Sequence, residues 1–278
     1  MRGLVLGGGG VTGIAWELGL VAGLADLGID LRAADRFVGT SAGSIVGAQL
    51  TSDADLESLY EHQLEPPSTE MVAAIDKRVA LGFVAALFTS RGDLEAFGRR
   101  LGSMSLRAAA AGRLPTLAAR YRAVGARLPS TQWPDHDLRI TAVDARTGVF
   151  RVLTRDDGVP LLRAAAASCA VPGVYPAVPI DGRLYIDGGA RTGANADVAR
   201  GCSAVVALTP MHRRVPGIPS TQRHLDALGV PSKIVTPDPA SLRAIGKNVL
   251  DTAARSASAQ AGRAQAVSAA EEIRAVWG

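Results

Sequence analysis

Short apolar runs, glycine turns and longer helical patterns alternate along the first fifty residues. Residues 3–6 predict a buried strand, and residues 12–27 carry apolar side chains at helical spacing. A second short strand is predicted at residues 36–38, followed by a helix at residues 42–50. This order of strand, turn and helix is typical of a parallel sheet with right-handed crossovers. We therefore predict an α/β fold with a mostly parallel central sheet flanked by helices.

A long stretch from residue 53 to residue 134 follows the helical period and shows no strand pattern. We interpret it as a helical insertion or cap that lies on the sheet domain. Its most apolar run, residues 79–88, lacks a polar face, so it is either an acyl-binding wall or a buried core helix. An Ala-rich helix is predicted at residues 241–277, broken near Ser256. The length of the chain favours a single domain that spans residues 1–278.

The sheet pattern returns after the insertion. Alternating residues at 138–143 and 149–154 are joined by a polar turn with glycine, which predicts a β-hairpin. A short helix is expected at residues 160–167. The apolar runs at residues 183–186 and 204–208 predict further strands of the same sheet.

A G-x-S-x-G pentapeptide, formed by Gly39, Ser41 and Gly43 with their neighbours, directly follows the second strand. A sharp turn from strand to helix needs glycine on either side of the turn residue, because a Cβ there would clash. Such a turn lifts the serine hydroxyl out of the sheet and places it at a helix N-terminus, where developing negative charge is stabilised. Ser41 is therefore a candidate nucleophile, with an ordinary strand–helix turn as the alternative.

The first strand runs into four glycines at residues 7–10. Their N–H groups can approach a ligand closely, and the following helix adds its N-terminal dipole. The spacing of Gly8, Gly10 and Gly13 also fits a dinucleotide fingerprint, but that motif needs an acidic residue at the end of the second strand, where none stands. A P-loop is excluded because no Gly-Lys-Ser or Gly-Lys-Thr follows. We therefore favour oxyanion donors over nucleotide binding.

A serine nucleophile also needs a general base. Asp187 ends a predicted strand and precedes two glycines, so its carboxylate can project into a site at the same sheet edge; a plain Asp-Gly turn is the alternative. Asp144 also ends a strand but fits a hairpin turn. The order Ser41, Asp187 and then a histidine would suit an α/β-hydrolase triad. The chain has four histidines: His62, His136, His212 and His224.

Four blocks together resemble the patatin-like phospholipase family. They have the order and the wide spacing of that family over most of residues 1 to about 210. They are similar, in turn, to its glycine-rich oxyanion motif, its nucleophile elbow, its A-S-x-A-x-P-x-x-F/Y-x-P block and its aspartate motif. In this chain the blocks are Gly8-Gly9-Gly10-Val11-Thr12-Gly13, Gly39-Thr40-Ser41-Ala42-Gly43-Ser44, residues 167–176 and Asp187-Gly188-Gly189.

The resemblance implies hydrolysis of lipid carboxylic esters, in the manner of a phospholipase A or lysophospholipase, with no cofactor and no metal in the chemistry. It implies a Ser–Asp dyad in which Ser41 attacks the ester carbonyl and Asp187 takes the serine proton directly. The amides of Gly8, Gly9 and Gly10 would hold the oxyanion, and an acyl-enzyme would follow. An aspartate that acts as a base must lie in a partly desolvated place.

Two positions depart from the family pattern. Thr12 stands where the family usually carries Arg or Lys, so a cation near the oxyanion is missing from this motif. Asn195 is followed by Ala196 and Asp197, whereas the family often has Asn-x-Pro after the aspartate motif. A lipid-binding or regulatory protein with a degenerate site is therefore the alternative to an enzyme.

The net charge of +4 is mildly basic, and arginines gather between Arg99 and Arg127. This stretch could face anionic lipid headgroups or a nucleic acid, but a solvated helix surface is the simpler interpretation. Aromatic residues for base stacking are scarce there, so no nucleic-acid partner is expected. A lipid or a small ester is the expected substrate, with contact at a membrane surface as a further expectation.

Two cysteines, Cys169 and Cys202, are too few for a disulfide framework or a zinc site and fit a reducing compartment. The first residues carry no signal-peptide pattern. The longest aliphatic run, residues 79–88, is too short to span a bilayer. We expect a cytoplasmic protein that is soluble or peripheral to a membrane.

Overall fold

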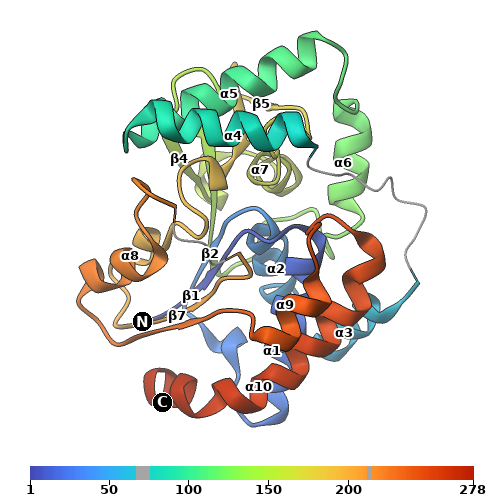
Figure 1. Cartoon of the computed structure of the whole chain (residues 1–278). Helices are drawn as coiled ribbons and strands as arrows, with labels where there is room; N and C mark the ends of the chain where they lie inside the picture. Colours follow the sequence, from blue (N-terminus) through green and yellow to red (C-terminus); the bar gives the residue numbers. More distant parts are fainter. Residues whose placement is uncertain (67–75, 212–214) are drawn as a thin grey trace.

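A computed structural model of the chain describes residues 1–66, 76–211 and 215–278. Within these ranges the predicted α/β fold is confirmed, with helices on both faces of one sheet (Figure 1). The strands are β1 (Arg2–Leu6), β2 (Arg36–Gly39), β3 (Asp137–Asp144), β4 (Phe150–Leu153), β5 (Val178–Ile180), β6 (Arg183–Asp187), β7 (Ala204–Leu208) and β8 (Ser232–Val235). The α-helices are α1 (Gly10–Asp26), α2 (Ala42–Leu50), α3 (Leu56–Leu64), α4 (Lys77–Ser90), α5 (Leu94–Ala110), α6 (Leu117–Gly125), α7 (Leu161–Ser168), α8 (Thr221–Leu228), α9 (Pro239–Ile245) and α10 (Arg255–Trp277).

The sheet is mixed, with the strand order β5-β6-β3-β2-β1-β7-β8 and with β4 paired to β3. Strands β3, β2, β1, β7 and β8 run parallel to one another. Strands β4 and β6 run antiparallel to β3, and β5 runs antiparallel to β6. The predicted parallel arrangement therefore holds for the centre and one side of the sheet. The other side is antiparallel because the chain returns there through hairpins.

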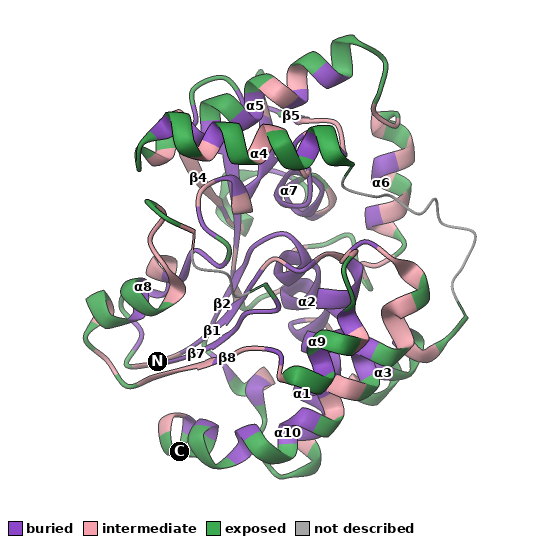
Figure 2. Cartoon of the chain, viewed as in Figure 1, coloured by how far each residue is buried: buried purple, intermediate pink, exposed green. Residues whose placement is uncertain are grey.

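Side chains alternate between the two faces of the central strands, as the pleat of a strand requires. Leu4 and Leu6 of β1 join the large core formed with α1, α2, α7 and α10. Val5 lies on the other face, in a smaller core that includes Leu225 of α8. Both faces are covered, and Figure 2 shows the central strands buried throughout. This explains why the strands of the sequence are short apolar runs without polar alternation.

The register of β3 sets the level at which two loops meet. Gly39 at the end of β2 lies opposite Ile140, and Asp187 at the end of β6 lies opposite Ala142. Ser41 lies two positions after Gly39 in the chain, as Ala142 lies two positions after Ile140. The turn after β2 and the end of β6 therefore reach the same height on the sheet, although they are far apart in the sequence.

The helices between residues 53 and 134 pack at several places around the sheet. Helix α3 packs against α1 and α10, α5 packs against β3 and β6, and α6 packs against α7. Helix α4 packs on α5 at the top of Figure 1. Its side chains Leu81, Val84 and Phe88 are 68%, 49% and 74% exposed, so α4 is not a buried core helix. In the described part of the chain, no helix combines the length and apolar character needed to cross a membrane.

The long C-terminal helix predicted at residues 241–277 is interrupted, and the interruption begins earlier than expected. Helices α9 and α10 are separated by residues 246–254, which include a 3-10 turn at Thr252–Ala254, so the break ends beside Ser256 but begins at Gly246. Gly246 has φ of +71° and ψ of −163°, which no α-helix can contain. The loop that follows reaches the glycine turn after β1, where the Thr12 N–H donates to the Val249 carbonyl at 3.2 Å. The break therefore brings Val249 and Leu250 to the edge where the candidate residues lie.

Helices α1 and α10 cross at glycines, and this contact supports the helix that begins at the glycine loop. A Cβ on Gly262 would lie 2.3 Å from the Trp16 carbonyl oxygen, which is a backbone atom that cannot turn aside. We predict that Gly262→Ala lowers the free energy of unfolding by about 1–3 kcal/mol. Chemical denaturation followed by circular dichroism measures the change.

Gly125→Ala is the matched control, because a Cβ there meets only Leu162 Cδ1 at 3.6 Å. It should leave the unfolding free energy nearly unchanged. Equal stability of the Gly262→Ala protein and the original protein would contradict the packing described here.

Candidate active site

Ser41 lies in a strained turn between β2 and α2. Its φ of +53° and ψ of −118° are unusual for a residue with a side chain. A Cβ on Gly39 would lie 2.6 Å from the Gly43 carbonyl oxygen, and a Cβ on Gly43 would lie 2.1 Å from that of Leu6. Both glycines of the pentapeptide are therefore required, because the turn is pressed against β1 and against its own helix.

Hydrogen bonds fix the backbone of Ser41 on both sides. Its N–H donates to Ser168 Oγ at 2.9 Å. Its carbonyl accepts from Ser44 Oγ at 2.7 Å and from Cys169 Sγ at 3.1 Å. Ser168 and Cys169 belong to the block at residues 167–176, so that block supports the serine turn directly.

Asp187 is brought together with Ser41 at the end of β6. The carboxylate is 5% exposed, and it accepts a hydrogen bond from the Gly189 N–H at 2.7 Å. Burial raises the pKa of Asp187 to about 6, although the nearby Ser41 hydroxyl, the Gly189 N–H and the charge of Arg120 act in the opposite direction. A carboxylate with this pKa is ionised at neutral pH and is more basic than an exposed aspartate.

The glycine loop offers fewer free donors than the sequence suggested. The Gly8 N–H donates to the Gly193 carbonyl at 2.8 Å and is therefore occupied. The N–H groups of Gly9 and Gly10 have no acceptor among the described residues. They lie at the start of α1, where Gly10 adopts φ of +61°. The Ala42 N–H, directly after Ser41, also lacks an acceptor in the described part of the chain.

A buried glutamate of α1 contacts the backbone of this glycine loop. The sequence did not predict this contact. Glu17 of α1 is fully buried, and its Oε1 accepts from the Gly7 N–H at 2.9 Å. Its Oε2 has no partner among the described residues. Burial raises the pKa of Glu17 well above its usual range, and the Gly7 hydrogen bond offsets this only in part. Its place in an apolar helical pattern gave no signal of this contact.

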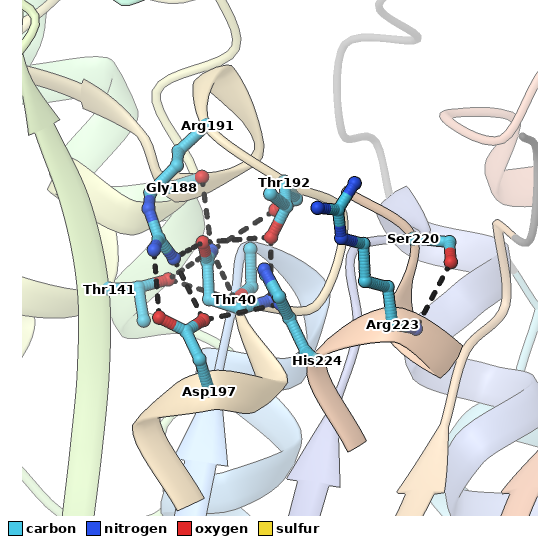
Figure 3. Close-up of polar contacts among 10 residues, drawn as sticks. Thr40, Thr141, Gly188, Arg191, Thr192, Asp197, Ser220, Arg223 and His224 are labelled. Carbon is cyan, nitrogen blue, oxygen red and sulfur yellow. Dashed lines mark hydrogen bonds and ion pairs between the residues drawn. The ribbon is translucent and has the colours of Figure 1, made fainter. Parts of the chain in front are cut away.

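A buried polar network joins the serine turn to the aspartate loop (Figure 3). Its centre is the Asn195 amide, which is fully buried. Asn195 Nδ2 donates to Thr40 Oγ1 at 3.1 Å and to the Gly188 carbonyl at 3.1 Å. Thr40 Oγ1 also lies 2.8 Å from Thr141 Oγ1 of β3. One side chain thus holds both Thr40, the neighbour of Ser41, and Gly188, the neighbour of Asp187. Asn195 makes these contacts although no proline follows it two residues later.

The described histidines have partners other than Ser41. His224 Nδ1 lies 3.2 Å from Asp197 Oδ1, and Asp197 is also held by Arg191 at 2.7 Å (Figure 3). Burial lowers the pKa of His224, with Asp197 acting in the opposite direction. His212 lies outside the described residues. The remaining two are His62, which pairs with Glu65, and His136, whose ring meets the edge of Phe37.

Ser41 opens into a narrow cavity of about 40 Å³. Its walls are apolar apart from Ser41 and two arginines. This volume admits a few small groups but not an acyl chain in this conformation. The lining residues are Gly10, Val11, Ile14, Ser41, Ala42, Ile45, Arg120, Val124, Arg127, Cys169, Val171, Tyr175 and Leu250.

Arg120 lines the cavity and is buried, although the sequence predicted an exposed position for it. The sequence places it among arginines interpreted as a solvated helix surface, but it is only 7% exposed. Its Nη2 donates to the Cys169 carbonyl at 2.9 Å, and its Cζ lies 3.8 Å from the centre of the Tyr175 ring. The burial of Arg120 follows from the packing of α6 on α7 and cannot be recognised from the spacing of residues along α6.

The described residues contain no group of three or more His, Cys, Asp or Glu side chains that could hold a metal ion.

Comparisons with known proteins agree with the four sequence blocks. A family model described as patatin-like phospholipase matches residues 4–200. "Lysophospholipase nte1" of Aspergillus niger (strain ATCC MYA-4892 / CBS 513.88 / FGSC A1513) is 47% identical over 58 residues, which cover 21% of this chain and 4% of that protein. "Lysophospholipase NTE1" of Coccidioides immitis (strain RS) is 37% identical over 101 residues, which cover 34% of this chain and 6% of that protein. The chain thus matches only a small part of the length of these relatives.

The raised pKa of Glu17 predicts a pH dependence of stability. The native state keeps this proton at pH values where the unfolded chain has released it, so unfolding becomes easier as pH rises above the unfolded pKa of about 4.3. We predict that Glu17→Gln flattens the fall of the melting temperature between pH 5 and pH 8. Thermal unfolding across this range measures the slope.

Glu61→Gln on α3 is a suitable control, because Glu61 is exposed. It should keep the slope of the original protein. If the Glu17→Gln protein kept that slope as well, Glu17 would be ionised in the native state and this account of the glycine loop would fail.

Proposed function

The chain belongs to the patatin-like phospholipase family, and from this we propose that it hydrolyses carboxylic esters of lipids through an acyl-enzyme on Ser41. The observation that carries the proposal is that the Ser41 hydroxyl lies beside the buried carboxylate of Asp187, near enough to lower its pKa. A carboxylate of raised pKa is a suitable base for a serine proton near neutral pH.

In the proposed first step Asp187 accepts the Ser41 proton while Oγ attacks the ester carbonyl carbon. The carbonyl oxygen becomes an oxyanion, and the N–H groups of Gly9, Gly10 and Ala42 are available to donate to it. The start of α1 adds the partial positive charge of a helix N-terminus. These donors are fixed before the reaction, which is the condition under which they lower the barrier most.

In the proposed second half of the reaction the tetrahedral intermediate collapses, and the leaving alcohol takes the proton from Asp187. The acyl group then remains on Ser41 Oγ as an ester. Asp187 accepts a proton from water, the hydroxide oxygen attacks the acyl carbon, and Ser41 is released with its proton restored through Asp187. Protons and bonds balance with the two side chains and one water molecule.

The substrate class is proposed from the family and from the relatives. The fungal relatives are named lysophospholipases. We extend this class to the chain as a glycerophospholipid or lysophospholipid ester. A lipid with a single acyl chain needs less widening of the narrow cavity at Ser41 than one with two chains.

Helix α4 is the proposed contact with a lipid surface. Its inner side chain Val79 shares a hydrophobic cluster with the cavity residue Leu250. Its outer side chains Leu81, Val84 and Phe88 form an exposed apolar stripe, at spacings of three and then four residues along one face. The helix begins with exposed Lys77 and Arg78. An exposed apolar stripe beside cationic side chains suits an anionic bilayer surface.

Two other functions remain as alternatives. A lipid-binding or regulatory protein with a degenerate site is favoured by Thr12, whose hydroxyl donates to the Val249 carbonyl at 3.3 Å and supplies no charge. A Ser-His-Asp esterase would need His212 or His224 beside Ser41, and His224 is paired with Asp197.

We predict that Ser41→Ala abolishes release of fatty acid from lysophospholipid, with a loss of roughly 10³-fold or more, because the nucleophile is removed. Asp187→Asn should fold and lose roughly 10²- to 10⁴-fold in kcat, because an amide cannot accept the proton. Chromatography of the released fatty acid measures both. Tight lipid binding without turnover by the unaltered protein would instead support the lipid-binding alternative.

The pH dependence of kcat/KM is the second prediction of this mechanism. Asp187 must be ionised to act as a base, and burial raises its pKa to about 6. The rate should therefore rise with pH through an inflection near 6 and level off above it. A rate that is independent of pH between 5 and 7.5, with chemistry limiting, would argue against Asp187 as the base.

The lipid contact predicts that Leu81→Gln and Phe88→Gln together weaken binding to vesicles that contain anionic phospholipid. Each apolar side chain withdrawn from lipid should lower the partition coefficient roughly tenfold. Val267→Gln on α10 is the control, because Val267 is 72% exposed on a different surface. Sedimentation with vesicles measures binding, and an equal effect of the control would contradict the contact.

A further inference from the structure

Arg120 reaches the candidate active site from α6, a helix of the stretch between residues 53 and 134. Helix α6 stands at the right of Figure 1, where it packs against α7. Arg120 lines the same cavity as Ser41 and is more than nine-tenths buried. A guanidinium is charged at every physiological pH, so the protein holds a permanent positive charge beside its nucleophile.

The donors of this guanidinium are only partly used. Nη2 donates to the Cys169 carbonyl at 2.9 Å, and the guanidinium carbon lies over the Tyr175 ring. Nε is buried without an acceptor, and no acceptor for Nη1 exists among the described residues. Asp187 is near enough to feel its charge, but no hydrogen bond joins the two side chains. A buried cation with unpaired donors is costly unless an anion completes it.

We propose that Arg120 binds the phosphate group of a glycerophospholipid substrate while its acyl ester lies at Ser41. Phosphate suits the position because a guanidinium presents a planar fork of N–H donors that matches two phosphate oxygens. In a glycerophospholipid the phosphate and the acyl ester stand on one glycerol unit, so one ligand presents both groups to the cavity that Arg120 and Ser41 line, once this narrow cavity widens. This inference rests on the proposed lipid hydrolysis, and it adds that the enzyme selects substrates whose headgroup carries a phosphate.

A fatty acid carboxylate is the other anion that a guanidinium in this place could hold, since it is the product of the proposed reaction. The two sources differ in what they predict. A headgroup site favours a lysophospholipid over a neutral monoacylglycerol of the same chain length. A product site favours the free fatty acid over both. The test must therefore compare these three ligands.

The experiment measures binding rather than turnover, in the full-length protein with Ser41→Ala so that no ligand is consumed. Isothermal titration uses octanoyl lysophosphatidylcholine, monooctanoylglycerol and octanoate. Each is titrated into the protein with Arg120, with Arg120→Gln and with Arg120→Lys. Arg122→Gln is the matched control, because it removes the same charge from an exposed position of α6. Circular dichroism confirms that each variant is folded.

We expect Arg120→Gln to weaken binding of the lysophospholipid roughly ten- to hundredfold, the value of a hydrogen-bonded charge pair. Binding of monooctanoylglycerol should stay within about twofold, Arg120→Lys should lose less than Arg120→Gln, and Arg122→Gln should change nothing. Equal losses for lysophospholipid and monoacylglycerol would show that Arg120 is only structural and overturn the proposal. A larger loss for octanoate than for the lysophospholipid would also overturn it, in favour of product binding.

A second measurement covers the case in which the Arg120 variants do not fold. Inorganic phosphate is added to the Ser41→Ala protein that keeps Arg120, and binding of the lysophospholipid is measured again. Competition by phosphate supports the site, and its absence at concentrations up to tens of millimolar contradicts it. If the unaltered protein hydrolyses neither lipid, the proposed function fails, but these binding results still decide the role of Arg120.

Discussion

The approach of the Ser41 hydroxyl to the buried Asp187 carboxylate is the constraint on which the rest of the site depends. It arises because a long strand, β3, pairs with β2 on one stretch and with β6 on the next, which brings the ends of both neighbours to one level. Burial keeps Asp187 more basic than an exposed aspartate. In the proposed mechanism this carboxylate takes the part for which many serine hydrolases use histidine.

The residues around this contact are fixed by close backbone packing and by buried hydrogen bonds, so a change of their conformation would cost free energy. Gly39 and Gly43 leave room for the serine turn where a Cβ would strike backbone. Asn195 ties the turn to the aspartate loop from the far side. Glu17 accepts a hydrogen bond from the Gly7 N–H behind the glycine loop, and burial favours its neutral form. The positive charge of the site comes from α6 through Arg120 rather than from the glycine motif.

The residues that a turn or a strand end reveals could be predicted from the sequence. Ser41 and Asp187 fall in this class, because glycines beside a strand end leave a local signal. The sequence marks Asn195 only through the family pattern after the aspartate motif. The contacts of its amide, like the buried position of Arg120, arise from packing between distant segments and could not be predicted. The start of the break after α9 was not predicted either, because an isolated glycine such as Gly246 does not by itself end a helical pattern.

The central claim is that Ser41 is activated by Asp187 alone, and labelling of the protein by a fluorophosphonate tests it most directly. Mass spectrometry locates the label, and the rate is compared among Asp187→Asn, His212→Ala and His224→Ala. The account predicts that the label is found on Ser41, that it is lost in Asp187→Asn and that it persists at nearly the original rate in both histidine variants. Rapid labelling of the Asp187→Asn protein, or loss of labelling in either histidine variant, would contradict it.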